Sequence, residues 1–312
     1  MTTAFIFPGQ GSQSVGMGKA LADASPAARA MFEQVDEALK QNLTRLMFEG
    51  PEDQLTLTAN AQPAIMASSL AALAVLEAEG GIRLAEKAAF VAGHSLGEYS
   101  ALAAAGAIPA DVTAKLLRRR GEAMQAAVPP GEGAMAAILG LGMEDVQAIA
   151  EEAAQGEVCT SANDNAPGQV VVSGHKAAVE RALVLAKAKG SRHAVLLPVS
   201  APFHCPLMAP AADAMAEALA AVSIAPPLVP LFANVTAAQV TAPEEIKALL
   251  VQQVTGTVRW RESVLAMQAA GVTRLVEFGG KVLGPMVKRI APDIQNLSVM
   301  KPDDIEAVLK AL

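Results

Sequence analysis

The chain has 312 residues; 52% are hydrophobic and only 3% aromatic, so its core must consist mainly of Ala, Val, Leu and Met side chains. The formal net charge of −7 argues against a nucleic acid or an anionic membrane as partner, because either would require a basic face. Only Cys159 and Cys205 are present and the histidines show no ligand spacing, which argues against a disulfide framework and against a metal site.

A short apolar strand, Thr3–Phe7, runs into a glycine-rich loop that begins at Pro8. The glycine spacing matches neither the dinucleotide fingerprint nor a phosphate-binding P-loop. Such a loop can instead present backbone N–H groups to an oxyanion, because small residues allow a ligand close to the main chain. Gln10 is the candidate donor, and the alternative is that it is only a turn residue. No Lys or Arg precedes Pro8, which is not the pattern of a signal peptide.

Two helices are predicted before the next strand. Residues Ala27–Leu39 show the helical period, and after a polar connection over Pro51–Leu57 an apolar helix opens at Gln62 and closes at Gly80-Gly81. This second helix carries no charge until Glu77, so we expect it to be buried against a sheet. No apolar run approaches the roughly 18 residues that a membrane span requires. We therefore expect a soluble, cytoplasmic protein.

The chain is organised around Ala88–Ser100, where a strand-length apolar run reaches Gly93-His94-Ser95-Leu96-Gly97 and a helix-forming stretch follows. A strand, a sharp turn and a helix form the context of a nucleophile elbow, with Ser95 exposed at the tip of the turn. The two glycines suit a strained turn in which strand and helix backbones come close. The alternative is an ordinary glycine-rich turn without a catalytic role.

The next helix begins at Pro109 and carries three consecutive arginines, Arg118, Arg119 and Arg120. Consecutive residues of a helix point in different directions, so at most one or two of them can face a pocket beside Ser95. The alternative for each arginine is a solvated basic face near a helix C-terminus.

A break at Pro129–Gly133 indicates a domain crossing. The predicted elements that follow are strand, helix, strand, strand, helix and strand, over Ala134–Leu139, Glu144–Ala154, Val158–Ala162, Gln169–Ser173, Ala177–Lys189 and Ala194–Val199. This βαββαβ order predicts an inserted ferredoxin-like domain over residues 129–199, with a loop at Asn163–Gly168. His175 and His193 are interpreted as structural or surface residues.

His204 lies between two prolines on a stiff segment at the second domain junction, where clefts form. It is the candidate general base, and the alternative is a junction histidine satisfied by the backbone. Beyond it, helices alternate with strands over Val229–Asn234 and Arg274–Phe278. We expect residues 1–128 and 200–312 to form a large α/β domain whose mostly parallel sheet is covered on both faces.

A serine nucleophile requires a base within hydrogen-bond reach and donors for the oxyanion of a tetrahedral intermediate. Ser95 and His204 supply the pair, and the backbone N–H groups of Leu96 and Gln10 are the expected oxyanion hole. No acidic residue between Ser95 and His204 is a convincing third member. This suggests a dyad whose histidine is oriented by an amide or a backbone carbonyl, while a nearby arginine would favour an acyl group with its own carboxylate.

Five motifs, in matching order from the first strand to the last helix, resemble the malonyl-CoA:acyl carrier protein transacylase family. They are Phe7-Pro8-Gly9-Gln10-Gly11-Ser12-Gln13, Gly93-His94-Ser95-Leu96-Gly97-Glu98-Tyr99-Ser100, Arg120-Gly121 with Met124-Gln125, Asn165-Ala166-Pro167-Gly168-Gln169, and Pro202-Phe203-His204. The resemblance implies an α/β-hydrolase-like large subdomain with a ferredoxin-like insertion. It also implies a ping-pong transfer: Ser95 takes malonyl from coenzyme A as an ester, and the phosphopantetheine thiol of acyl carrier protein removes it, with His204 as base and acid in turn.

The resemblance assigns further residues to the site. Arg120 would hold the malonyl carboxylate in a bidentate pair, and the backbone carbonyl of Gln253 would orient the histidine. In related acyltransferases a Leu at the position of Leu96 and a Phe at the position of Phe203 go with malonyl rather than with branched methylmalonyl substrates. Thr257-Val258-Arg259-Trp260 departs from the family pattern, in which many members have a proline shortly before the tryptophan. The remaining expected substrate contacts are Leu96 and His94.

The resemblance also implies the partners. They are malonyl-CoA and acyl carrier protein, with no cofactor because the coenzyme A thioester is itself a substrate, and we expect a monomer. Cations that could dock the acidic carrier protein are Lys187, Lys189, Arg192, Lys281, Lys288 and Arg289. Two alternatives remain: a serine thioesterase or esterase of related fold, which would turn over in water without an acceptor thiol, and a non-catalytic subunit that docks a carrier protein.

Overall fold

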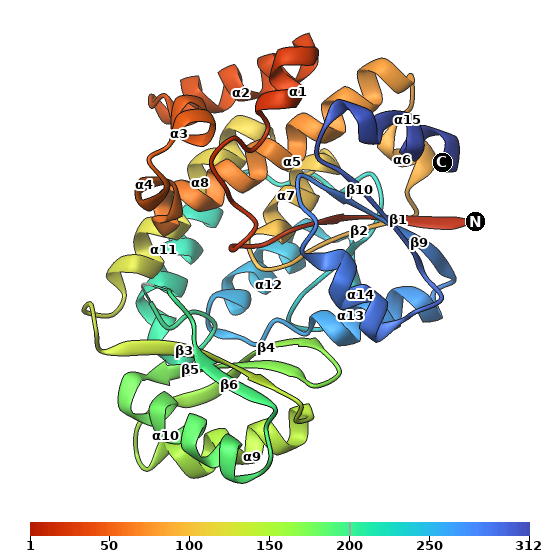
Figure 1. Cartoon of the computed structure of the whole chain (residues 1–312). Coiled ribbons are helices and arrows are strands. Elements are labelled where there is room, and N and C mark those ends of the chain that lie inside the picture. Colours follow the sequence, from red (N-terminus) through yellow and green to blue (C-terminus); the bar gives the residue numbers. More distant parts are fainter. Residues whose placement is uncertain (200) are drawn as a thin grey trace.

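The computed structural model describes residues 1–199 and 201–312, which form an α/β fold with two separate sheets (Figure 1). The larger sheet has six strands in the order β10-β9-β1-β2-β7-β8. These strands are β1 (Thr2–Phe7), β2 (Phe90–Gly93), β7 (Leu231–Phe232), β8 (Gln239–Val240), β9 (Val272–Phe278) and β10 (Gln295–Val299). Only β7 and β8 pair antiparallel, so the prediction of a mostly parallel sheet is confirmed. The neighbouring strands β1 and β2 therefore end at the same edge of the sheet.

Helices cover both faces of this sheet. Along β1, Phe5 and Phe7 belong to one buried cluster while Ala4 and Ile6 belong to another, as the alternation of side chains along a strand requires. The second cluster is covered by α13 (Trp260–Ala269) and α14 (Leu283–Ile290). The helices on the first cluster are α1 (Lys19–Ala24), α2 (Pro26–Leu39), α3 (Leu43–Glu49), α4 (Glu52–Thr56), α5 (Thr58–Gly80), α6 (Leu84–Lys87), α7 (Gly97–Ala104), α8 (Ala110–Ala126), α11 (Ala209–Ala220), α12 (Pro243–Thr255) and α15 (Pro302–Ala311).

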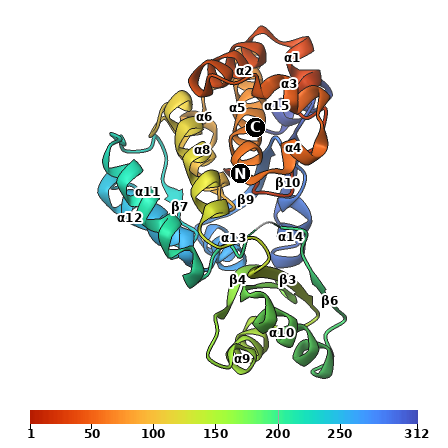
Figure 2. The ribbon, with the colours of Figure 1, turned by 90° about the vertical axis from the view of Figure 1, so that its left-hand side faces the viewer.

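The smaller sheet is antiparallel throughout and has the strand order β4-β5-β3-β6. Its elements follow the predicted order of strand, helix, strand, strand, helix, strand: β3 (Gly133–Leu139), α9 (Met143–Ala154), β4 (Cys159–Ala166), β5 (Gln169–His175), α10 (Lys176–Ala188) and β6 (His193–Leu196). Ala136 and Ile138 pack under α9 and α10, whereas Met135 on the opposite face joins the core of the larger part. Figure 2 shows this sheet, with its two helices on the outer side, below the larger part.

The predicted loop at Asn163–Gly168 is wrong, because Asn163–Ala166 continue strand β4 and only Pro167-Gly168 form the turn. Contacts with the larger part extend the strand. The Asp164 backbone N–H donates to the Val258 carbonyl (2.9 Å), and its buried carboxylate is bidentate with Arg261 (2.9 and 3.0 Å to Nε). These long-range bonds hold the smaller sheet against the start of α13 and the segment before it, and a local sequence pattern does not contain them.

The apolar helix α5 begins at Thr58 rather than at Gln62, with Pro63 inside it. A proline near a helix start removes few backbone hydrogen bonds, so it does not mark the first residue here. The expectation that no run is apolar enough for a membrane span is also wrong. Helix α5 is long enough to cross a membrane, and its most apolar stretch of 18 residues has a mean hydropathy of 1.4. However, 89% of that stretch is buried inside the protein, as in the core helix of a soluble protein.

Other differences lie at the edges of the fold. The predicted strand Val229–Asn234 is shortened to β7, and the polar connection Pro51–Leu57 contains the short helix α4. Strand β10 was not predicted, because it is an edge strand with polar residues at Gln295, Asn296 and Ser298 rather than a continuous apolar run.

Candidate active site

The turn between β2 and α7 carries Ser95 at a backbone φ of +53°, in the left-handed region that non-glycine residues seldom adopt. Asn234, which follows β7, braces this turn from both sides. Its Oδ1 accepts the Ser95 backbone N–H (2.8 Å), and its Nδ2 donates to the Gly93 carbonyl (2.7 Å). The strained conformation is therefore held by a neighbouring strand end, which is how such strain persists.

The two glycines of the turn are required by close packing. A Cβ on Gly93 would lie 1.9 Å from the Gly97 carbonyl oxygen, and a Cβ on Gly97 would lie 2.2 Å from the Phe7 carbonyl oxygen. Both distances are far below van der Waals contact, and both obstacles are backbone atoms that cannot move aside. The Gly-x-Ser-x-Gly spacing thus allows α7 to start directly against the ends of β1 and β2.

Ser95 and His204 are in direct contact. Ser95 Oγ lies 2.7 Å from His204 Nε2, and His204 Nδ1 lies 2.8 Å from the backbone carbonyl of Gln253. Because a carbonyl only accepts, Nδ1 carries the proton, and the lone pair of Nε2 faces the serine hydroxyl. No carboxylate contacts His204 in residues 1–199 and 201–312, so the contact is a dyad oriented by a backbone carbonyl.

The environment keeps His204 neutral. Burial lowers the pKa of His204 to about 3, and the positive charge of Arg120 acts in the same direction. The imidazole is therefore unprotonated at neutral pH and can accept a proton from Ser95.

Arg120 is the buried cation of the site. Its Nη1 donates to Gln62 Oε1 (2.9 Å), and its Nη2 donates to Gln253 Oε1 (2.8 Å) and to Ser95 Oγ (3.1 Å). The guanidinium carbon also lies 5.7 Å from the ring centroid of Tyr99, within reach of a cation–π interaction. Within the described parts of the chain no carboxylate forms an ion pair with Arg120. The guanidinium can thus accept an anionic ligand.

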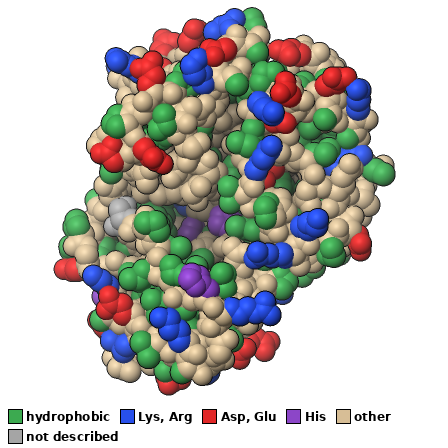
Figure 3. All heavy atoms as spheres, viewed as in Figure 1, with side chains coloured by type: hydrophobic (Ala, Val, Ile, Leu, Met, Phe, Trp, Pro, Cys, Tyr) green, Lys and Arg blue, Asp and Glu red, His purple; other side chains and the backbone are tan. Residues whose placement is uncertain are grey.

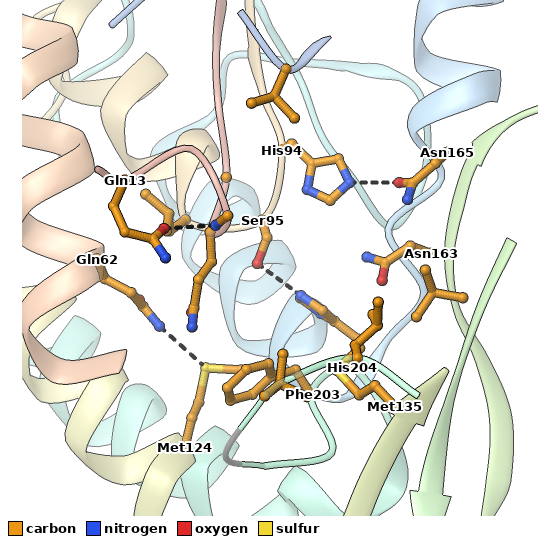
Figure 4. Close-up of a pocket in the computed structure, with 18 of the residues that line it drawn as sticks. Gln13, Gln62, His94, Ser95, Met124, Met135, Asn163, Asn165, Phe203 and His204 are labelled. Atoms are coloured by element: carbon orange, nitrogen blue, oxygen red, sulfur yellow. Dashed lines mark hydrogen bonds between the residues drawn. The ribbon is translucent and has the colours of Figure 1, made fainter. Parts of the chain in front are cut away.

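These groups line a pocket of about 350 Å³ between the two sheets, which appears in Figure 3 as a hollow with histidine side chains inside it. Figure 4 shows Ser95 and His204 facing each other across it, with Phe203 and Met124 on one side. Strands of the smaller sheet supply Met135, Asn163, Asn165 and Val171, and the start of α14 supplies Val282, Leu283 and Met286. The pocket is mostly apolar around a few convergent polar groups, as ligand sites are.

Comparison with known proteins decides the family, because the acyl transferase domain model matches residues 4–279. This chain belongs to the acyl transferase family. It is 45% identical, over 99% of its length, to a malonyl CoA-acyl carrier protein transacylase of Bacillus subtilis, of which 96% is covered. An acyl-carrier-protein-S-malonyltransferase from Bartonella henselae has a crystal structure with a TM-score of 0.98 at 54% identity, covering 100% of this chain and 99% of that one. A type II PKS acyl-carrier protein in complex with its malonyl-transacylase gives a TM-score of 0.96 at 40% identity, covering both chains completely.

The acyl transferase brings together the residues that the sequence singled out. The pocket is lined by Gln10, His94, Ser95, Leu96, Arg120, Phe203 and His204. Gln253 is fully buried behind them and reaches His204 through its carbonyl despite the unusual loop that follows it. Among the three arginines, Arg118 is bound to Asn60 and Gln41 and Arg119 is exposed, so only one faces the pocket.

The other predicted site residues lie at the rim of the same pocket. His94 Nε2 is 2.8 Å from Asn165 Oδ1, which ties the elbow to strand β4 of the smaller sheet. Burial lowers the pKa of His94, so its ring is neutral as well. Gln10 reaches Thr58 with its side chain (3.4 Å). Leu96 is the N-cap of α7, where backbone N–H groups lack a partner within the helix.

Three buried polar residues of this acyl transferase were not predicted as site residues from the sequence: Gln62, Glu98 and Asn234. Gln62 binds Arg120, Asn234 holds the Ser95 turn, and the Glu98 carboxylate accepts from the Asn234 backbone N–H and from Gln253 Nε2. A signal existed for two of them, because Gln62 is a polar residue in a helix that is mostly apolar up to Glu77, and Glu98 is a charge at the start of the buried helix α7. Asn234 gave no such signal.

Proposed function

We propose that this acyl transferase moves a malonyl group from malonyl-CoA to the phosphopantetheine thiol of acyl carrier protein through an ester on Ser95. The observation that carries the proposal is the position of the Arg120 guanidinium. It is buried, its Nη2 lies 3.1 Å from Ser95 Oγ, and it has no carboxylate partner in the described chain. An acyl group that bears its own carboxylate supplies that partner. The names of these two relatives agree, since both name malonyl transfer involving acyl carrier protein.

In the first half-reaction Ser95 Oγ attacks the thioester carbonyl of malonyl-CoA while His204 Nε2 takes the hydroxyl proton. The oxyanion accepts hydrogen bonds from the backbone N–H groups of Leu96 and Gln10, each worth about 3 kcal/mol of the barrier. When the tetrahedral intermediate collapses, the C–S bond breaks and His204 returns the proton to the coenzyme A sulfur. The products are the malonyl ester of Ser95 and free coenzyme A.

The second half-reaction reverses these roles. The thiol of the carrier's phosphopantetheine gives its proton to His204 and attacks the ester carbonyl, and Ser95 leaves with that proton. The dyad and the two thiols account for every bond and proton, so we propose that no cofactor and no metal takes part.

Selectivity follows from the walls around the acyl group. Arg120 holds the malonyl carboxylate in a bidentate pair, and Phe203, His94 and Leu96 line the space beside the malonyl methylene. A methyl branch at that carbon meets the Phe203 ring. We therefore propose that malonyl is preferred over methylmalonyl.

The chain architecture fits this role. We infer an α/β-hydrolase-like large subdomain over residues 1–128 and 200–312 and a ferredoxin-like small subdomain over residues 129–199, with the pocket between them. The enzyme is a cytoplasmic monomer that uses neither nucleic acid nor membrane. The acidic net charge argues against nucleic acid as a partner, and the burial of α5 argues against a membrane.

The titration of His204 gives a testable pH dependence. Because the pKa of His204 is lowered to about 3, the neutral base persists as the pH falls through 6.5, the ordinary value. For acetyl-CoA, an uncharged acyl donor, kcat/KM for acylation is expected to stay constant down to about pH 5. Stopped-flow measurement of coenzyme A release checks this. An acid limb with a midpoint between pH 6 and 7 would show that the base titrates as an ordinary histidine.

Carrier docking is expected to depend on salt. The six cations named for docking are all exposed, and those on α14 lie next to the pocket-lining residues of that helix. Figure 3 shows several Lys and Arg side chains on the right-hand side of the hollow. The KM for carrier protein is expected to rise several-fold between about 0.05 and 0.5 M salt.

A charge reversal tests the same docking surface. Lys288→Glu is expected to raise the KM for carrier protein further, whereas Lys19→Glu on α1, a surface lysine paired with Asp23, leaves it unchanged. A KM for carrier protein that is independent of salt and equal in both variants argues for another surface.

The serine thioesterase or esterase alternative makes a different prediction. It releases coenzyme A from malonyl-CoA at the same rate with or without an acceptor thiol, whereas the transferase needs the acceptor for turnover. Release of coenzyme A is therefore measured with and without holo-acyl carrier protein, together with the mass of the carrier. Acceptor-dependent turnover with a malonylated carrier supports the proposal, and acceptor-independent release of malonate overturns it.

A further inference from the structure

Glu98 is a buried carboxylate beside the dyad that the reaction steps above do not use. It is 1% exposed in the first turn of α7, three residues after Ser95. Its Oε2 accepts from Gln253 Nε2 (2.7 Å) and from the Asn234 backbone N–H (3.2 Å). A carboxylate is seldom buried without a positive partner, and no cation contacts it directly in the described structure.

The positive charge nearest to Glu98 in this network is Arg120, and the Gln253 side chain lies between the two. The Gln253 side chain donates to Glu98 and to the Ser95 carbonyl (2.9 Å) through Nε2, and it accepts from Arg120 through Oε1 (2.8 Å). The Gln253 backbone carbonyl holds His204. One buried glutamine thus links the carboxylate, the guanidinium, the nucleophile and the base.

The Gln253 amide is held in one orientation by Glu98 and the Ser95 carbonyl on its NH₂ side and by Arg120 on its oxygen side. An ionised carboxylate only accepts hydrogen bonds and a guanidinium only donates them, so the amide must turn its NH₂ to Glu98 and its oxygen to Arg120. In the reversed orientation, the Gln253 NH₂ would face the N–H groups of Arg120, and the Gln253 oxygen would face the carboxylate oxygen of Glu98, so neither contact could be a hydrogen bond. The observed orientation leaves Arg120 Nη2 beside Ser95 Oγ, on the pocket side.

We propose that Glu98 is a positioning residue that, through the Gln253 amide, holds the Arg120 guanidinium in place for the carboxylate of the acyl group. This role rests on the proposed function and adds a specificity determinant to it. Glu98 contacts no substrate. It compensates the buried positive charge from a distance and leaves the guanidinium itself unpaired, as a site that binds a ligand carboxylate requires.

Protonation of Glu98 is expected to weaken this arrangement. Burial raises the pKa of Glu98 to about 7, against the lowering effects of its hydrogen bonds and of Arg120. The titratable groups around it are Arg120 from α8, Tyr99 from α7 and, beyond Gln253, His204. Burial raises the pKa of Tyr99 and lowers that of His204, so both are neutral near pH 7 and Glu98 is the group that titrates there.

The test compares malonyl-CoA with acetyl-CoA as acyl donor, with holo-acyl carrier protein as acceptor, in the wild type and in Glu98→Gln. The amide in the variant has no charge and can turn either group toward Gln253, so the variant removes the negative charge and one of the contacts that hold the Gln253 amide. The ratio of kcat/KM for malonyl to that for acetyl is expected to fall about tenfold. The dyad serves both donors, so its effects cancel in this ratio.

Glu77→Gln is the matched control. Glu77 is a half-buried carboxylate on α5 that accepts the Leu84 backbone N–H (2.9 Å) and lies outside the pocket lining. Its replacement is expected to leave the malonyl-to-acetyl ratio unchanged. An equal loss of both donors in Glu98→Gln, or an unchanged ratio, overturns the proposal.

The wild type provides a second test that does not depend on folding of a variant. Its malonyl-to-acetyl ratio is expected to fall as the pH decreases from 8.5 to 5.5, with a midpoint near 7, because Glu98 gains a proton. A flat ratio in the wild type overturns the proposal. If the wild type does not prefer malonyl at pH 8.5, the proposed function fails and this inference fails with it. A wild type that prefers malonyl with a pH-independent ratio removes this inference alone.

Discussion

Replacement of Ser95 by alanine is expected to lower malonyl transfer by at least about 10⁴-fold, because the ester intermediate cannot form without the hydroxyl. The remaining oxyanion donors and the substrate contacts would still bind malonyl-CoA. The rate is measured as malonyl-carrier formation with purified variant and holo-acyl carrier protein. The substitution does not change the backbone, so residue 95 can keep its left-handed conformation and its N–H can still donate to Asn234 Oδ1.

A matched serine variant controls for general effects of this substitution. Ser191→Ala removes a hydroxyl that donates to the Leu139 and His193 carbonyls in the smaller sheet, outside the pocket lining. It is expected to keep transfer within about twofold of the wild type. Residual transfer above one tenth of the wild-type rate in Ser95→Ala would contradict covalent catalysis at this serine.

The second large effect is expected from Arg120→Ala, which separates charged from uncharged donors. Removing one partner of a buried charge pair costs about 3 to 4 kcal/mol, or roughly 10²- to 10³-fold in kcat/KM for malonyl-CoA. The acetyl group has no carboxylate that Arg120 could bind, so the rate of acetyl transfer is expected to change little. Both donors are assayed with the same carrier protein.

Arg118→Ala is the control for this prediction, since Arg118 lies two positions away on the same helix and binds Asn60 on the outer side. Its replacement is expected to leave both donors unaffected. The Arg120 variant also leaves Gln62 and Gln253 without a donor, so thermal unfolding is recorded for both variants. Equal losses of malonyl and acetyl transfer in Arg120→Ala would contradict a role in holding the carboxylate.

The parts of the site that could be predicted from the sequence are those that depend on residues close together in the chain. The elbow is visible because Gly93 and Gly97 stand where backbones touch, and His204 stands out on a proline-flanked segment. The alternation of helices with strands likewise predicted a mostly parallel sheet. The dyad's lack of an acidic partner also followed from the sequence, because no suitable acid lies between its two members.

What the sequence could not show depends on contacts between distant elements. Asn234 braces a turn 139 positions earlier, and Gln253 reaches Glu98 across 155 positions. The continuation of β4 through Asn163–Ala166 likewise depends on bonds to Val258 and Arg261. Such pairs have no local periodicity, so only the folded chain reveals which buried polar residues satisfy one another.

The most direct test of the account is the intact mass of the wild-type protein after incubation with malonyl-CoA and no acceptor, followed by peptide mapping. We expect one malonyl adduct on Ser95, which holo-acyl carrier protein removes while the mass of the carrier rises by one malonyl group. An unmodified Ser95 with free malonate accumulating in solution would contradict it.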